Sequence, residues 1–124
     1  MCGIFPRQSI SLRSDVCYPD GSILSTLLFD NAVRVRVDDV DIDGIDYSAA
    51  FTYLETQAAT KEIIVQIQRI NGERWAKAIY RMSDVVYDTT NSRLDMCIAE
   101  ILVANSGIGP ASSVTEYSVC FDIV

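Results

Sequence analysis

A two-residue turn signal between two alternating runs constrains the fold of this chain more than any other feature. Residues 62–70 read EIIVQIQRI, residues 73–82 read ERWAKAIYRM, and Asn71 and Gly72 join them. Alternation of apolar and polar residues is the pattern of a strand that buries one face. Asn-Gly readily adopts the positive φ angles that a two-residue hairpin loop needs. The sequence therefore predicts an antiparallel hairpin over residues 62–82.

The expected two-residue loop also assigns each hairpin side chain to a face. In this register Ile64 pairs with Ile79, and Gln66 pairs with Lys77. One face holds the expected core residues Ile63, Val65, Ile67, Ala76, Ala78 and Tyr80. The other face is polar, yet it holds an aromatic side chain, two isoleucines and two cations, a mixture that suits a protein interface. We predict a contact between chains at Ile64, Trp75, Lys77, Ile79 and Arg81. A solvated face with a half-exposed Trp75 is the alternative.

The remaining segments mostly predict strands and loops. Residues 32–38 (AVRVRVD) and 116–124 (EYSVCFDIV) alternate as strands do. Residues 18–22 and 105–113 are rich in the Gly, Pro, Asp and Ser of turns and loops. Residues 22–30 (SILSTLLFD) fit either a strand or a short helix.

Residues 92–105 (SRLDMCIAEILVAN) are ambiguous. Helical spacing of their apolar residues and a capping-box pair at Ser92 and Asp95 favour a helix. So apolar a run also fits a buried strand. Together the elements predict one mainly β domain over residues 1–124, an antiparallel sandwich or barrel with one or two short helices. An α+β fold is the alternative.

Charge is unevenly placed along this acidic chain, whose formal net charge is −7. Residues 38–60 hold six acids and no base, whereas residues 61–93 hold six bases and four acids. Opposite patches favour head-to-tail contact between like subunits, and pairing within one chain is the alternative. A nucleic-acid binder usually presents a basic face, so the acidic composition argues against direct binding of nucleic acid.

The chain contains no histidine, and this limits its chemistry. Without histidine there is no Ser-His or Cys-His pair, no imidazole metal ligand, and no usual general base near neutral pH. We therefore expect neither an enzyme activity nor a cofactor.

The cysteines do not form a recognisable motif. They are Cys2, Cys17, Cys97 and Cys120, and none belongs to a Cys-x-x-Cys pair. The first residues lack the charged and apolar regions of a secretory signal peptide, and no apolar stretch has the length of a membrane span. Reduced, buried thiols are therefore the expected state. We expect a cytoplasmic or virion location with no membrane contact, and disulfides are the alternative if the protein leaves the cell by another route.

The stretch DVDIDG, at residues 39–44, matches the first half of a calcium-binding loop of the EF-hand type. Its alternate carboxylates offer the oxygen ligands that calcium prefers, and its glycine allows a sharp turn. The candidate metal ligands are Asp39, Asp41 and Asp43. The second half of the motif departs, because Ala50 stands where the bidentate Glu belongs. The alternative is a strand and turn with the apolar residues on one side and the acids in solvent.

The N-terminal residues MCGIF resemble the start of glutamine amidotransferases that use an N-terminal cysteine as nucleophile. The resemblance implies that Cys2, once Met1 is removed, attacks the glutamine amide with its own α-amino group as base. It also implies that Asn71 and Gly72 line an oxyanion hole. Pro6 departs from the family pattern, and further family motifs are absent from the sequence. A packed or inert N-terminal cysteine is the alternative.

These observations favour a non-enzymatic structural subunit that associates with itself or with other assembly subunits, of the kind that viral and phage particles contain. A calcium- or ligand-binding β-module is the first alternative. An amidotransferase-like fragment is the second.

Overall fold

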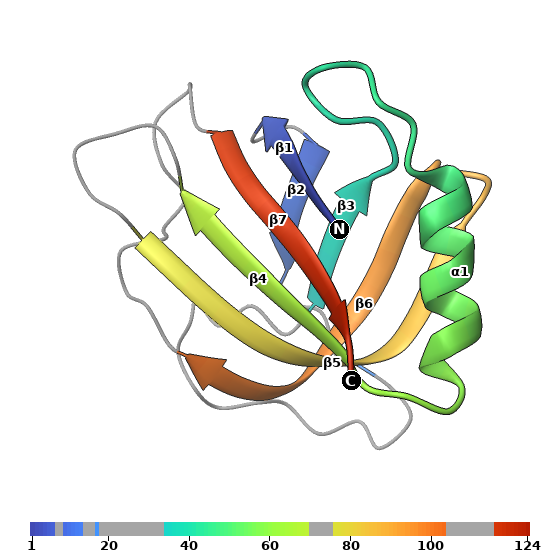
Figure 1. Ribbon diagram of the computed structural model, residues 1–124, viewed down its shortest axis with the longest axis vertical. Coiled ribbons are helices and arrows are strands. Elements are labelled where there is room, and N and C mark those ends of the chain that lie inside the picture. Colours follow the sequence, from blue (N-terminus) through green and yellow to red (C-terminus); the bar gives the residue numbers. More distant parts are fainter. Residues whose placement is uncertain (7–8, 14–16, 18–33, 70–75, 104–115) are drawn as a thin grey trace.

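The described part of the chain is a single antiparallel sheet of seven strands that curls into a nearly closed barrel, with one helix outside it (Figure 1). The computed structural model describes residues 1–6, 9–13, 17, 34–69, 76–103 and 116–124. The expected turn at Asn71 and Gly72, the side chain of Trp75, and the segments 18–30 and 105–113 lie outside these residues. The prediction of a mainly β barrel or sandwich is confirmed.

The order of the strands explains why the sheet curls. The elements are β1 (Cys2–Pro6), β2 (Ile10–Arg13), β3 (Arg34–Asp38), α1 (Ser48–Ala58), β4 (Ile63–Arg69), β5 (Ala76–Asp88), β6 (Arg93–Val103) and β7 (Glu116–Ile123). Across the sheet the order is β1-β7-β4-β5-β6-β3-β2, so β1 and β2 form its two edges. The chain passes from one edge to the other between Pro6 and Ile10, so these edges must lie near each other. β3 and β7 confirm, over the described residues, the strands expected from alternation.

The predicted faces of the hairpin are confirmed, but its register is wrong. The residues expected in the core and described in the structure are all buried: Ile63, Val65, Ile67, Ala78 and Tyr80. In the structure Ile64 opposes Arg81 and Gln66 opposes Ile79, a shift of two positions. Side chains alternate with a period of two, so this shift leaves each one on its predicted face, and the hydrophobic pattern cannot distinguish the registers. The structure, not the alternation, shows which register forms.

The helix favoured at residues 92–105 is wrong, because this segment forms strand β6. It pairs with β5 on one side and with β3 on the other, which satisfies its backbone N–H and C=O groups. Leu94, Met96 and Ile98 alternate into the core. Ser92, the expected helix cap, has a φ of 54° in the turn before the strand. The apolar run suits either structure, and the neighbouring strands select the extended one.

Helix α1 lies in the acidic segment 38–60, where no helix is predicted. Its first residue donates its backbone N–H to the Asp46 carboxylate (2.7 Å), which satisfies one free donor of the helix terminus. Phe51 and Leu54 lie one turn apart and are fully buried. The Phe51 ring meets that of Phe121 at a centroid distance of 5.5 Å. One face of α1 therefore completes the aromatic part of the core beside β5 (Figure 1).

All four cysteines form disulfides, so the expectation of reduced thiols is wrong. Cys2 in β1 bonds to Cys120, which lies directly opposite in β7, with the Cα atoms 4.1 Å apart. At the adjacent position the Phe121 N–H donates to the Met1 carbonyl (2.9 Å). Because antiparallel pairs alternate, Cys2 and Cys120 form a non-hydrogen-bonded pair, the kind in which side chains approach most closely.

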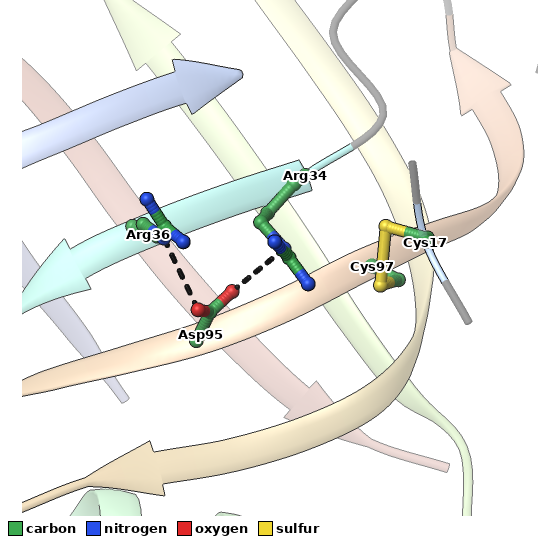
Figure 2. The surroundings of a disulfide bond; sticks show 5 residues. All are labelled: Cys17, Arg34, Arg36, Asp95 and Cys97. Atoms are coloured by element: carbon green, nitrogen blue, oxygen red, sulfur yellow. Dashed lines mark hydrogen bonds and ion pairs between the residues drawn. A yellow bond between two sulfur atoms is a disulfide. The ribbon is translucent and has the colours of Figure 1, made fainter. Parts of the chain in front are cut away.

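The second disulfide joins Cys17 to Cys97 of β6, with the Cα atoms 5.7 Å apart (Figure 2). Its partners are 80 residues apart in the sequence, and those of the first disulfide are 118 residues apart. No local spacing marks such pairs, because they form only once distant strands become neighbours.

Candidate functional site

The described residues of the predicted interface lie together on one face of the sheet. Ile64 on β4 and the three residues on β5 alternate with buried core residues and therefore face outward. Val103 of β6 opposes Ile79 and extends this face. We call it the hairpin outer face, formed by Ile64, Gln66, Lys77, Ile79, Arg81 and Val103. Trp75 lies outside the described residues, so its place on this face stays a prediction.

The hairpin outer face carries aliphatic side chains that the barrel does not fully bury. Ile64 and Ile79 are half-buried and lie diagonally across β4 and β5. Val103 is exposed on the next strand. Diagonal neighbours on paired strands are close enough for long side chains to touch. These three residues therefore form an aliphatic strip across three strands.

Cations border this strip. Lys77 is exposed, and Arg81 donates from Nη2 to Glu100 Oε2 at 3.3 Å. The pair is solvent-exposed, so it contributes little to stability on its own. Asp122 of β7 stands opposite Ile64 as an acid at the other border. The rim thus carries charges of both signs, and its exposed cation, Lys77, suits a protein surface that is apolar and acidic.

Residues 39–47 connect β3 to α1 in a tight reversal, which we call the acidic turn. The Gly44 N–H donates to the Asp41 carbonyl (3.0 Å), and the Asp41 N–H donates to the Ile45 carbonyl (3.1 Å). Gly44 has a φ of 79°, a left-handed conformation that glycine adopts without a Cβ clash. The acidic turn is thus a hairpin-type turn with a glycine bulge.

Asp41 holds the acidic turn together from inside. Its side chain is buried, and its Oδ1 accepts the N–H groups of Asp43 and Ile45, each at 2.9 Å. Its Oδ2 accepts the Tyr47 hydroxyl at 3.1 Å. Burial and this hydrogen bond raise the pKa of the Tyr47 hydroxyl. Three donors therefore offset the cost of burying the carboxylate.

The three candidate metal ligands serve separate interactions. Asp39 accepts the Tyr87 hydroxyl at 2.6 Å, and this bond raises the pKa of Tyr87. Asp41 is bonded within the acidic turn, and Asp43 is exposed. Within the described ranges, no three Asp, Glu, Cys or His side chains gather as a metal ion requires. The structure does not bring the three carboxylates together, and calcium binding stays an untested prediction.

Exposure in the acidic turn is the reverse of what its alternation suggests. The three aliphatic side chains are largely exposed, at 43% for Val40, 45% for Ile42 and 52% for Ile45, whereas Asp41 is buried. Asp46 is exposed, and hydrogen bonding by Ser48 lowers its pKa. The acidic turn therefore presents aliphatic side chains next to carboxylates at the surface.

A further charged cluster lies on the outside of β3 and β6 (Figure 2). Arg34 and Arg36 each direct Nε to one oxygen of Asp95, both at 3.1 Å. Alternation with buried valines indicates that the two arginines share a face, but their partner is 59 residues away from Arg36 in the sequence. Sequence reasoning therefore had no signal for this cluster.

A pocket of about 410 Å³ adjoins this cluster and the Cys17–Cys97 disulfide. Its lining includes Arg34, Asp84, Asp88 and Asp95. Asp88 accepts hydrogen bonds from the backbone of Thr90 and Asn91, and Asp95 is paired with arginine. Asp88 thus bonds to the turn between β5 and β6, and Asp95 links β6 to β3.

Cys2, which the resemblance to glutamine amidotransferases implies as a nucleophile, forms a disulfide. Cys2 Sγ is bonded to Cys120 Sγ, so it offers no thiolate for attack on an amide. Asn71 and Gly72, the residues implied for an oxyanion hole, lie outside the described residues.

Comparison with known proteins leaves the function to be argued from the structure. Neither a family model, nor a curated protein, nor a solved structure matches this chain. In the part of the chain that the structure describes, no helix is long and apolar enough to cross a membrane.

Proposed function

We propose that this protein is a non-enzymatic structural subunit that associates with copies of itself. The observation that carries the proposal is the hairpin outer face, where an aliphatic strip of Ile64, Ile79 and Val103 is left partly exposed beside Lys77 and Arg81. Protein interfaces bury apolar cores within polar rims of this kind.

A second copy is a suitable partner because the same chain carries the opposite charge elsewhere. Residues 38–60 hold six acids and no base. Two copies can therefore place an acidic surface of one against the basic rim of the other. Electrostatic complementarity of this kind orients partners and speeds their encounter.

The two disulfides indicate where such an assembly would be located. Disulfides persist in oxidising environments, including the surfaces of virus particles, and are rare in the reducing cytosol. We therefore favour a component of a viral or phage particle over a cytoplasmic protein.

Sedimentation velocity of the wild type and of a hairpin variant tests the proposal. Ile79→Thr combined with Lys77→Glu removes the aliphatic centre and reverses one rim charge, while threonine retains β-propensity. We expect the wild type to associate, more weakly at high salt because the rim charges are screened. The variant should stay monomeric with an unchanged circular dichroism spectrum.

The matched control is Val86→Thr, which changes an exposed residue of β5 outside both the hairpin outer face and residues 38–60. It should associate like the wild type. A wild type that remains monomeric at every concentration and salt tested would contradict self-association.

A further inference from the structure

We propose that the acidic turn of one subunit docks on the hairpin outer face of the next. This inference rests on the proposed self-association and names the second surface of the contact. The acidic turn projects from the end of β3 at the top of Figure 1, away from the body of the barrel. It is therefore placed to reach another molecule.

The aliphatic side chains of the acidic turn point outward. Val40, Ile42 and Ile45 are each more than two-fifths exposed, within a segment of only six residues. Scattered apolar residues are normal on protein surfaces, but a grouped set marks a contact site. The side chain of Asp41, by contrast, is buried.

Hydrogen bonds hold the acidic turn in place within a single subunit. Besides the bonds of Asp41, the Ile42 N–H donates to the Ile4 carbonyl of β1 (2.8 Å). The Tyr47 hydroxyl also lies 3.1 Å from the Cys2 carbonyl. Because the turn is held both internally and against β1, docking requires little further loss of conformational entropy.

The two surfaces are complementary. The acidic turn presents aliphatic side chains beside the exposed Asp43 and Asp46. The hairpin outer face presents aliphatic side chains beside Lys77 and Arg81. Docking would bury the aliphatic side chains of the two surfaces against each other and place the carboxylates of the turn near the cations at the rim of the face.

This contact is heterologous, because it joins two different surfaces of identical subunits. A bound pair retains one free turn and one free face, so further subunits can add until the chain of subunits closes on itself. Such contacts produce rings or open filaments rather than a closed two-fold dimer.

Mixing two complementary variants tests the arrangement. The turn variant Ile42→Ser with Ile45→Ser retains the hairpin outer face, and the face variant Lys77→Glu with Ile79→Thr retains the acidic turn. We expect each variant alone to associate at least about tenfold more weakly than the wild type, the effect of losing one well-buried aliphatic side chain. An equimolar mixture should form a dimer of one turn variant and one face variant, measured by native mass spectrometry and sedimentation.

The outcomes separate this inference from the proposed function. A wild type that associates while the turn variant associates equally well would overturn the docking of the turn and leave self-association standing. Two monomeric variants whose mixture stays monomeric would also overturn the head-to-tail contact. A monomeric wild type would contradict the proposed function itself.

A second turn variant allows the same test if the first one does not fold. Asp43→Lys changes an exposed side chain and keeps the backbone N–H that bonds to Asp41. If the double serine variant unfolds, as judged by circular dichroism, this variant should still weaken association, and it should be rescued by mixing with the face variant. Association of Asp43→Lys equal to that of the wild type would then count against the turn.

Discussion

Asp41 lies buried in the acidic turn, where an unpaired carboxylate would cost folding free energy. It accepts hydrogen bonds from two backbone N–H groups and one hydroxyl, and these donors replace the water molecules that the carboxylate loses on burial. The same hydrogen bonds determine which neighbours face outward. One polar residue thus sets the conformation that exposes Ile42 and Ile45 at the surface.

Asp46 makes the start of α1 sensitive to acid. Hydrogen bonds from Ser48 lower its pKa below the usual value of 3.8, so folding favours the ionised carboxylate. A lowered pKa contributes stability above the unfolded-state value, and this contribution is lost as the pH falls through the folded-state value. We expect Asp46→Asn to be less stable than the wild type at neutral pH, and the difference to shrink below about pH 4.

Urea denaturation of both proteins across this pH range measures the effect. Asparagine keeps an oxygen that accepts the helix N–H, so the comparison isolates the charge. A difference in unfolding free energy that stays constant with pH would show that the ionisation of Asp46 does not stabilise the helix.

At the scale of elements, α1 is held by its buried face rather than by its own sequence. Its N-cap, Tyr47, makes no side-chain capping bond, and most of its stability must come from packing. Phe51 is fully buried against Phe121, Tyr47 and Tyr87, with ring centroids 5.5 to 6.2 Å away. The helix therefore depends on the barrel as much as it completes the core.

Truncation of Phe51 measures this dependence. We expect Phe51→Ala to lower the free energy of unfolding by about 3–5 kcal/mol, because it removes contacts and leaves a cavity. Tyr53→Ala is the matched control, since Tyr53 is two residues away on the same helix and 54% exposed. Urea unfolding that gives similar losses for both variants would show that α1 does not pack on the barrel as described.

At the scale of the whole molecule, the disulfides fasten both edges of the sheet. Cys2–Cys120 ties edge strand β1 to β7, and Cys17, which follows edge strand β2, is tied to β6. A covalent link between distant residues limits the conformations of the unfolded chain. The barrel is thus stabilised where unpaired strand edges would otherwise fray.

Removal of the first disulfide tests its contribution. We expect Cys2→Ser with Cys120→Ser to lose about 2–5 kcal/mol of unfolding free energy, as cross-links that close long loops do. Thiol titration of the denatured, unreduced wild type should detect no free cysteine. Free thiols that peptide mapping assigns to Cys2 and Cys120 would show that this cross-link is not formed, and an unchanged stability of the double variant would show that it does not stabilise the fold.

Local sequence pattern was enough to predict which side chains of the hairpin pack in the core. Alternation with a period of two is a local property, and Ile63, Val65 and Ile67 are buried as it predicts. The same local pattern predicted the final strand, β7, and the grouping of Ile64 with Ile79 on the outer face. The mainly β class followed from these elements.

Only the tertiary structure decided the features that depend on distant partners. The apolar run at residues 92–105 became a strand because β5 and β3 flank it, and the cysteines paired because their strands came together. The salt bridges of Asp95 have the same origin. Local alternation encodes which face a side chain occupies, whereas strand partners, disulfides and ion pairs are chosen by contacts between segments far apart in the chain.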